Sequence, residues 1–252
     1  MSQPVSDGYR ADLAYIHDVG FGNFAREAAP GLLDRLSRAR AKLPSGGTRL
    51  VVDLGCGSGL WSRALLDGGY DVLGFDISPA MIRLARARAP GGQFRCQSFL
   101  RARLPPCLAV TALGEVFNYL FDRSHSPRTM AALFARVYRA LPPQGVFIFD
   151  VAVAGRVPGG SRRGHWLGDD WACLVSVRED AARQLLVREI TSFRRVGKSY
   201  RRDHEVHRLR LFERAATAAA LTEVGFKVRT LAGYGKMRLP PGWIAFEARK
   251  PA

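Results

Sequence analysis

Three closely spaced glycines follow a short apolar run in the sequence VVDLGCGSGLWSRALL, residues 51–66. The run before them is typical of a buried strand, and the segment after them has the apolar spacing of a helix. Glycine lets the chain turn sharply and lets a ligand approach the backbone without meeting a Cβ atom. Open α/β sheets bind ligands at this place, the carboxyl end of a strand. Gly55, Gly57 and Gly59 therefore predict a ligand-binding turn.

The spacing of these glycines differs from the one that binds dinucleotides. A GxGxxG pattern that starts at Gly55 needs its third glycine at the position of Leu60. A second feature lies 23 residues after Asp53, where the segment GFDIS places Asp76 at the end of the next apolar run. A carboxylate at that point can accept hydrogen bonds from both ribose hydroxyls of a nucleoside. The two features together predict a ligand that contains a nucleoside and argue against a pyrophosphate on the glycines.

The elements that must position these residues alternate between strands and helices. We expect strands at 49–54, 70–76, 93–97, 108–113 and 145–151, with helices at 60–67, 79–89 and 127–141 between them. Apolar strands that alternate with helices pair in parallel through right-handed crossovers. The pattern predicts an open α/β sheet with helices on both faces. The same rhythm returns near the end of the chain, with a helix at 214–223 and strands at 226–231 and 243–250.

Two segments depart from this alternation. Residues 9–42 have apolar residues at helical spacing, interrupted by glycines at 20 and 22 and by Pro30 with Gly31, which predicts two or three short helices. Residues 156–212 contain three long half-polar runs, at 171–179, 183–196 and 199–212. Alternation of polar and apolar residues predicts an antiparallel sheet with one face toward solvent. We therefore expect this sheet to be an insertion into the α/β core.

From about residue 45 to its end, the chain resembles the class I S-adenosylmethionine-dependent methyltransferases, and DLGCGSG at 53–59 and Asp76 carry the likeness. The resemblance implies a Rossmann-like α/β fold with seven strands in the order 3-2-1-4-5-7-6, the last strand being antiparallel. It implies three parts. These are an N-terminal helical lid at 1–44, a methyltransferase core at 45–155 and 213–252, and an antiparallel β cap at 156–212. It also implies S-adenosylmethionine as cofactor and S-adenosylhomocysteine as product.

The resemblance assigns cofactor contacts residue by residue. Gly55 and Gly57 should pass under the methionine part of the cofactor, Asp53 should help hold its ammonium group, and Asp76 should bind the ribose. At Ser98 the family usually has an acid for the adenine amino group, so that contact is weakened here. The full expected set is Asp53, Gly55, Gly57, Gly59, Asp76, Ile77, Met81, Ser98, Phe99 and Leu113. Ile77, Met81 and Phe99 are also typical of core packing, so both roles stay open for them.

Methyl transfer from a sulfonium is an in-line displacement, in which the protein mainly aligns the reactants and excludes water. A general base is needed only where the acceptor is protonated. Glu115 follows the fourth strand beside the expected methyl position, and His17 lies in the segment that covers the cofactor in similar enzymes. His204 and His207 are further candidates. Glu115 could equally be an acid that begins a helix, and His17 a surface histidine.

The substrate class must come from the insertion. Its placement is similar to that in the glycine and amino-sugar N-methyltransferases, where it covers the active site, and Trp166, Trp171 and Tyr200 could line an apolar pocket. The segment ALGEVFNY lacks an NPPY-like signature of nucleic-acid amino methylation. We expect transfer to a nitrogen or oxygen of a small molecule. The alternatives are an RNA or protein methyltransferase with a basic insertion, and a cofactor-binding module without turnover.

The composition is that of an ordinary folded protein, with 47% hydrophobic and 24% charged residues among 252. The net charge is +16, but 33 of the 38 basic residues are arginines spread along the chain, which indicates a solvated surface. The four cysteines and five histidines lack metal-ligand spacing, so we expect no metal site. No apolar run reaches roughly 18 residues and no signal-peptide pattern opens the sequence. We expect a cytoplasmic monomer or homodimer without a membrane partner.

Overall fold

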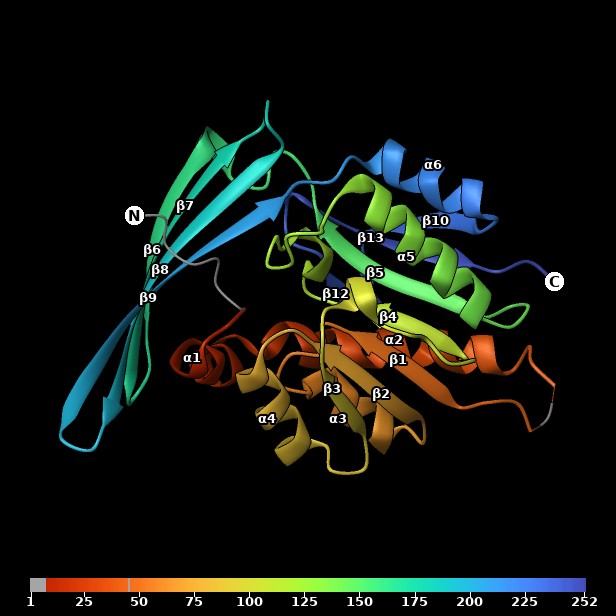
Figure 1. Ribbon diagram of the computed structural model, residues 1–252, viewed down its shortest axis with the longest axis horizontal. Helices are drawn as coiled ribbons and strands as arrows, with labels where there is room; N and C mark the ends of the chain where they lie inside the picture. The colour runs from red at the N-terminus through yellow and green to blue at the C-terminus, as the bar shows by residue number, and fades with distance from the viewer. Residues whose placement is uncertain (1–7, 45) are drawn as a thin grey trace.

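Seven apolar segments form the central sheet (Figure 1). They are β1 (Leu50–Leu54), β2 (Asp71–Asp76), β3 (Gln93–Cys96), β4 (Ala109–Ala112), β5 (Val146–Ala152), β10 (Lys227–Leu231) and β13 (Trp243–Arg249). Their order is β3-β2-β1-β4-β5-β13-β10, and β13 is antiparallel to both neighbours. The computed structural model, which describes residues 8–44 and 46–252, thus confirms the expected sheet.

Helices cover both faces of this sheet, because successive strand residues point to opposite faces and both sets are apolar. One face packs against α2 (Asn23–Arg40), α3 (Leu60–Asp67) and α4 (Pro79–Arg88). The other packs against α5 (Pro127–Ala140) and α6 (Arg214–Val224). Short elements complete the core: the hairpin of β11 (Gly233–Tyr234) and β12 (Met237–Arg238), and the 3₁₀ turns η1 (Phe99–Arg101), η2 (Val116–Asn118) and η3 (Pro158–Gly160). The helices leave the carboxyl ends of the parallel strands available for a site.

The N-terminal segment forms two helices, α1 (Ala11–Phe21) and α2, joined by a single residue. The break that the sequence predicted at Pro30 and Gly31 is wrong, because Pro30 lies inside α2. Pro30 is exposed, so the carbonyl group that loses its donor can bind water, while Leu32 on the other face is fully buried. Gly31 serves packing, since a Cβ atom there would lie 2.3 Å from the carbonyl carbon of Tyr234.

A second sheet of four antiparallel strands projects from the core (Figure 1) and is called the cap sheet below. Its strands are β6 (Ser161–Leu167), β7 (Trp171–Asp180), β8 (Leu185–Val196) and β9 (Ser199–Arg210), in that order. The sequence predicted three of them and missed β6. Its sequence, SRRGHWL, has little apolar alternation, and every residue except Gly164 is exposed, as suits an edge strand.

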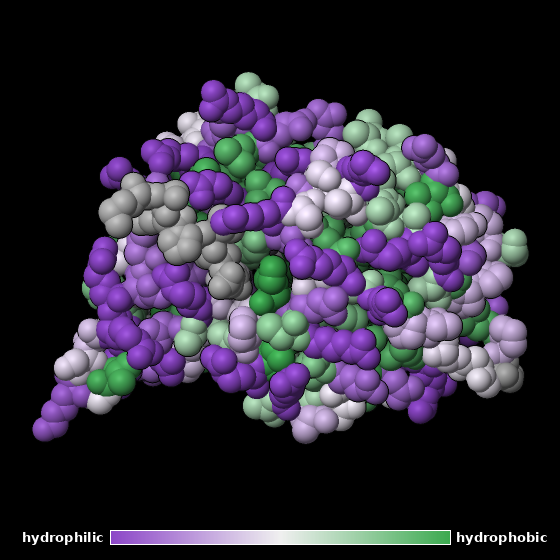
Figure 2. All heavy atoms as spheres, viewed as in Figure 1, coloured by the Kyte–Doolittle hydropathy of each residue, from purple (hydrophilic) through white to green (hydrophobic). Residues whose placement is uncertain are grey.

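Helix α1 packs against both α4 of the core and β8 of the cap sheet. It therefore connects two parts of the molecule that are far apart in the sequence (Figure 1). Figure 2 shows hydrophilic side chains over most of the face in view, in keeping with the arginine-rich composition. Within the described part of the chain, no helix combines the length and the apolar character needed to span a bilayer.

Candidate active site

A cavity of about 510 Å³ lies at the carboxyl ends of β1, β2 and β4, where they face α1 and the cap sheet. The strand ends contribute Asp53 and Asp76, α1 contributes His17 and Phe21, and the cap sheet contributes apolar residues such as Val175. This is the edge at which open α/β sheets bind ligands. The volume falls within the range of roughly 300 to 1,000 Å³ that is usual for ligand pockets.

The three glycines of the turn after β1 have different tasks, although all have positive φ angles of 69°, 53° and 78° in chain order. At Gly57 a Cβ atom would meet no atom within 4 Å, and the residue lines the cavity. At Gly55, which also lines the cavity, a Cβ atom would lie 2.3 Å from a methyl group of Val116. Gly59 lies outside the cavity wall, and a Cβ atom there would lie 2.9 Å from the Cα atom of Ala85. The structure therefore places Gly59 where it fits α3 against α4.

Asp76 presents a partly buried carboxylate to the cavity at the end of β2. One oxygen accepts the backbone N–H of Gly57 at 2.9 Å, and the other accepts that of Ser78 at 2.8 Å. The carboxylate thus ties the glycine turn to the start of α4. Burial raises its pKa to about 6, against the effect of the backbone donors.

Asp53 lies deeper, at the end of β1. Its oxygens accept hydrogen bonds from Ser62 Oγ at 2.8 Å and from Thr111 Oγ1 at 3.2 Å. Thr111 is held in turn by Trp61, whose Nε1 donates to its hydroxyl at 3.0 Å. Burial raises the pKa of Asp53 to about 7, which the two hydroxyl donors partly oppose.

The other expected cofactor residues also lie in the wall of this cavity: Ile77, Met81, Ser98, Phe99 and Leu113. Met81 is almost fully buried and packs against Ala14 of α1. Ser98 is buried as well. Its Oγ accepts a hydrogen bond from the backbone N–H of Leu100, and this bond caps the start of η1. The structure thus brings nine of the ten expected residues to one cavity, all except Gly59.

Glu115 and His17, the two leading acid–base candidates, both line the cavity but differ in their surroundings. Glu115 is buried, and one of its oxygens accepts a hydrogen bond from Arg188 while the other lies 3.8 Å from Arg156 Nε. His17 contacts the ring of Tyr9 edge-on, and its Nδ1 has no hydrogen-bond partner among the described residues. Burial lowers the pKa of His17 to about 4, so its ring is neutral at pH 7.

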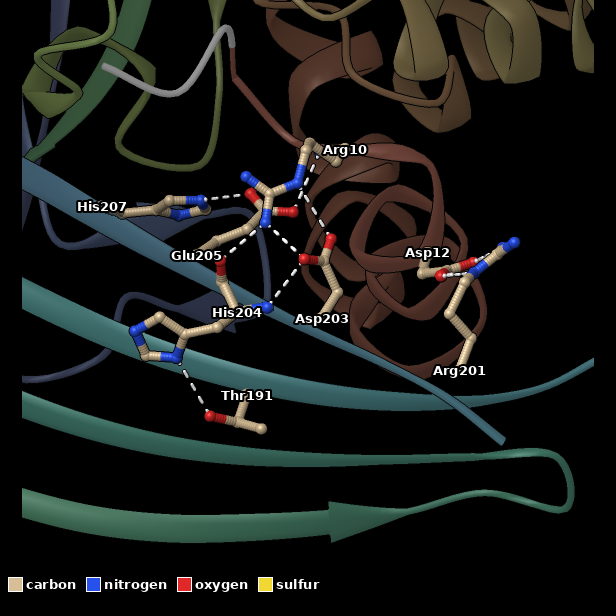
Figure 3. A network of polar contacts seen from close by, with 8 residues as sticks. All are labelled: Arg10, Asp12, Thr191, Arg201, Asp203, His204, Glu205 and His207. Atoms are coloured by element: carbon tan, nitrogen blue, oxygen red, sulfur yellow. Dashed lines mark hydrogen bonds and ion pairs between the residues drawn. The ribbon is translucent and has the colours of Figure 1, made fainter. Parts of the chain in front are cut away.

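The two further histidine candidates, His204 and His207, lie outside the cavity wall, and Figure 3 shows their polar partners. His204 is paired with Thr191 at 3.1 Å, and His207 is buried with its Nε2 2.9 Å from Glu205. Of the aromatic residues expected in an acceptor pocket, Trp166 lines the cavity. Trp171 packs instead against α1, and Tyr200 is exposed near the tip of the β8–β9 hairpin.

Several residues that sequence reasoning missed also shape the site. Arg188 of β8 donates to Glu115 and, at 3.0 Å, to the hydroxyl of Tyr119, which lies 2.8 Å from the hydroxyl of Tyr9. Arg188 and Tyr9 are distant in sequence from Glu115 and Tyr119, so only the position of Arg188 among alternating apolar residues could have indicated an inward side chain. Asp122 lines the cavity too, and its Oδ2 is buried without a hydrogen-bond partner among the described residues, although it lies 3.7 Å from Nε of Arg101.

Asp150, at the end of β5, was also missed and shapes the site from beneath. One of its oxygens accepts the backbone N–H groups of Gly114 and Glu115 at 2.9 and 2.7 Å. The other accepts the hydroxyl of Tyr234 at 2.9 Å. Burial raises the pKa of Asp150 to about 7, against these donors. The residue fixes the turn after β4, which carries Leu113 and Glu115 into the cavity.

Charged groups hold α1 over the cavity from two sides, and Figure 3 shows the side toward the cap sheet. On the cap side, Arg10 binds Asp203 at 2.5 Å, and Asp12 accepts from Arg201 at 2.5 Å. On the core side, Arg88 of α4 donates to both oxygens of Asp18, at 2.6 and 2.8 Å. Arg88 also donates to the carbonyl oxygen of residue 58 in the glycine turn at 2.8 Å. The helix is therefore tied directly to the turn expected to bind the cofactor.

Comparison with known proteins places these features in a family. Residues 51–145 match a family described as a methyltransferase domain. A Geobacillus protein named as a methyltransferase is 28% identical over 195 residues, which are 72% of this chain and 75% of that protein. Trans-aconitate 2-methyltransferase of Methylobacterium radiotolerans is 35% identical over 112 residues, covering 42% of this chain and 39% of that protein. An 18S rRNA (guanine-N(7))-methyltransferase of Arabidopsis thaliana is 31% identical over 117 residues, covering 43% and 40%.

Two solved structures resemble this fold over nearly its full length. The sugar N-methyltransferase KedS8 from a Streptoalloteichus species has a TM-score of 0.77 at 18% identity, covering 100% of this chain and 98% of that chain. CalS10, an amino pentose methyltransferase from Micromonospora echinaspora with S-adenosylmethionine bound, has a TM-score of 0.72 at 20% identity, covering 99% and 100%. At these identities the likeness concerns the fold.

The sheet order, the glycine turn with its carboxylates and the methyltransferase-domain match over residues 51–145 support a class I S-adenosylmethionine-dependent methyltransferase. S-adenosylmethionine, which is bound in the CalS10 structure, is the cofactor of this class and supplies a methyl group activated by a positively charged sulfur. The residues present fit that group. Gly57 leaves open space beside the backbone, and Asp76 offers a partly buried carboxylate at the cavity wall.

Proposed function

We propose that this enzyme transfers the methyl group to a nitrogen or oxygen nucleophile of a small molecule. The observation that carries this proposal is the cavity, which is walled by the core, by α1 and by the cap sheet together. A polymer needs an open groove, whereas a pocket covered on three sides suits a small acceptor. The names of similar proteins support it, since KedS8 is a sugar N-methyltransferase and one relative is a trans-aconitate 2-methyltransferase.

We propose that α1, the core and the cap sheet act as lid, catalytic body and cover. In this arrangement residues 1–44 include the lid, 45–155 with 213–252 form the body, and 156–212 form the cover; residues 1–7 and 45 lie outside the described residues. The contacts of α1 with both neighbours support this division. A closed lid excludes water and fixes the acceptor beside the methyl group.

On the cofactor side, Asp76 is proposed to accept the ribose hydroxyls and Asp53 to face the ammonium group. Gly55 and Gly57 are proposed to border the methionine part. Their exposure to one cavity supports these roles, since the three kinds of contact must lie along a single ligand. Ile77, Met81, Phe99 and Leu113 are proposed to form the apolar wall for the adenine and the ribose.

Asp122 is proposed to replace the acid that is absent at Ser98. It follows η2 in the connection to α5, lies in the same cavity wall as Ser98, and has a buried oxygen without a hydrogen-bond partner among the described residues. Its other oxygen accepts the backbone N–H and the hydroxyl of Ser124. A buried carboxylate oxygen needs a donor, and the amino group of adenine supplies one.

On the acceptor side, the chain has to align the nucleophile and, for a protonated acceptor, remove a proton. His17 is proposed as that base, because its neutral ring faces the cavity and has a nitrogen without a partner among the described residues. Glu115 is proposed to position Arg188, since its carboxylate is already engaged by that guanidinium. Alignment in a closed site can lower the barrier by up to about 7 to 11 kcal/mol without other chemistry.

An RNA substrate is the second candidate, favoured by the relative that acts on 18S rRNA and by exposed arginines of β9 such as Arg202 and Arg208. Other arginines of the insertion have structural partners. Arg194 and Arg201 both pair with Asp12 of α1. The basic charge of the cap sheet therefore serves in part to hold the proposed lid.

The proposal is tested with purified enzyme, S-adenosylmethionine and separate pools of amino sugars, hydroxy acids, RNA and unfolded protein. Formation of S-adenosylhomocysteine and the mass of the methylated product are measured. We expect turnover with one small-molecule pool. Methylation of RNA or protein alone would overturn the proposal, and cofactor binding without any methylated product would favour a binding module.

A further inference from the structure

The cap end of the cavity carries more positive than negative charge. Arg156, Arg162 and Arg188 line it there, and Glu115 is the carboxylate at that end. The wall has three other carboxylates. Asp53 and Asp76 lie beside the glycine turn, and Asp122 lies beside Ser98. One acid therefore faces three guanidinium groups, and Arg163 on the edge strand adds a fourth.

The strand register explains how these arginines converge. Arg162 of β6 pairs with Val177 of β7, and Val177 pairs with Arg188 of β8. Residues paired across a sheet point to the same face, so both arginines belong to one row on the inner face. Arg156 enters from the connection between β5 and β6, and its guanidinium lies 5.2 Å from the ring of Trp243.

The three arginines differ in what already satisfies them. Arg188 donates to Glu115 and to Tyr119, so its hydrogen-bonding needs are largely met within the protein. Arg156 lies 3.8 Å from Glu115, and its Nε is buried without a hydrogen-bond partner among the described residues. Among the described residues, no carboxylate forms an ion pair with Arg162. Burial, together with the charges of Arg188 and Arg162, lowers the pKa of Arg156 although Glu115 opposes this.

We infer that the methyl acceptor carries an anionic group, a carboxylate or a phosphate, which binds Arg156 and Arg162 at the cap end of the cavity. This inference deepens the proposed function and rests on it. A guanidinium offers two parallel N–H donors to such an oxyanion. Bound there, the anion offsets the charge of Arg156, which burial makes costly, and it directs the rest of the acceptor toward the glycine turn.

The inference is tested on the enzyme saturated with S-adenosylhomocysteine, by calorimetric titration with citrate and with inorganic pyrophosphate. We expect saturable binding of at least one anion at one site per chain. Binding of citrate points to a carboxylate acceptor, and binding of pyrophosphate to a phosphorylated one. Arg156→Gln/Arg162→Gln should weaken that binding about tenfold or more, because charge-assisted hydrogen bonds are lost.

The matched control is Arg202→Gln/Arg208→Gln, which removes the same charge from exposed positions on the outer face of β9. It should leave anion affinity unchanged. Absence of binding, or equal weakening by both double variants, would overturn the inference. S-adenosylhomocysteine affinity checks that each variant is folded, and Arg162→Gln alone replaces the inner double variant if that variant unfolds. Methylation of a neutral acceptor would overturn this inference and leave the proposed function standing.

Discussion

The carboxylate of Asp76 is partly buried at the end of β2, and desolvation raises its pKa to about 6. Ribose hydroxyls donate to the ionised form, so ligand binding should lower this pKa and release a proton. Affinity for S-adenosylhomocysteine should therefore rise by about tenfold between pH 5 and pH 7, and Asp53 should contribute in the same direction. Asp76→Asn should weaken binding at pH 7 and reduce the pH dependence. Titration calorimetry at both pH values checks this, and a flat profile for the unmodified enzyme would contradict it.

Gly57 and Gly69 allow a matched test of the glycine turn. Both have positive φ angles, 53° and 79°, and a Cβ atom at either would meet no atom within 4 Å. Only Gly57 lines the cavity. Each valine substitution should cost about 1 to 2 kcal/mol of stability through backbone strain, but Gly57→Val alone should abolish S-adenosylhomocysteine binding. Melting temperature and affinity are measured for both, and loss of binding in both variants would show that strain is the cause.

The proposed contact of Asp122 with adenine predicts selectivity for the amino group. Asp122→Ala should bring the affinities for S-adenosylhomocysteine and its deaminated inosine analogue close together, because the carboxylate accepts from the amino group only. The unmodified enzyme should prefer the adenine form by about tenfold, the value of one charge-assisted hydrogen bond. Competition binding measures both ligands. Unchanged selectivity in the variant would remove Asp122 from the cofactor site.

At the scale of elements, α1 is held by ion pairs with the cap sheet and with α4. Lids belong to the least stable parts of a structure. Asp18→Asn breaks the bidentate contact with Arg88 and should speed amide exchange across residues 9–30 by about tenfold, since a partly buried charged hydrogen bond is lost. S-adenosylhomocysteine should slow exchange there, while β1 and β5 stay protected in every state.

The control for this prediction is Asp34→Asn. Asp34 pairs with Arg38 on the exposed side of α2, and exposed helix pairs contribute little. Its exchange pattern should match that of the unmodified enzyme. Hydrogen exchange read by mass spectrometry distinguishes the two variants. Exchange in residues 9–30 that ignores both Asp18→Asn and the ligand would make α1 an ordinary packed helix.

The sequence predicted elements well where local pattern decides them. The strand, glycine turn and helix at 51–66 and the acid at Asp76 follow from spacing alone, whereas the strand order came from the resemblance. Pro30 predicts a break, because local rules do not include the packing that keeps α2 continuous. The pair of Glu115 and Arg188 joins residues 73 apart, so no local pattern could reveal that the expected base is already engaged.

At the scale of the whole molecule, the net charge is +16. Some of the arginines that give this charge face solvent, some pair with α1, and some line the cavity. Because the cavity lies beneath α1, a polyanion bound to the outer arginines should not reach it. An excess of RNA should therefore leave methylation of a small acceptor unchanged at about 0.15 M salt, where exposed charges are largely screened. Product formation is measured with and without RNA. Inhibition that disappears in Arg202→Gln/Arg208→Gln would instead indicate an RNA site on the cap sheet.

Gly20 of α1 faces Trp171 so closely that a Cβ atom there would lie 2.6 Å from the indole ring. The separation between α1 and the cap sheet is thus set by the absence of one methyl group. Alanine at this position would require either the helix or the indole to move, and the helix is joined through Asp18 and Arg88 to the glycine turn after β1. In evolutionary terms, the contact leaves no room for an added carbon, so residue 20 stays a glycine unless α1 or Trp171 shifts as well.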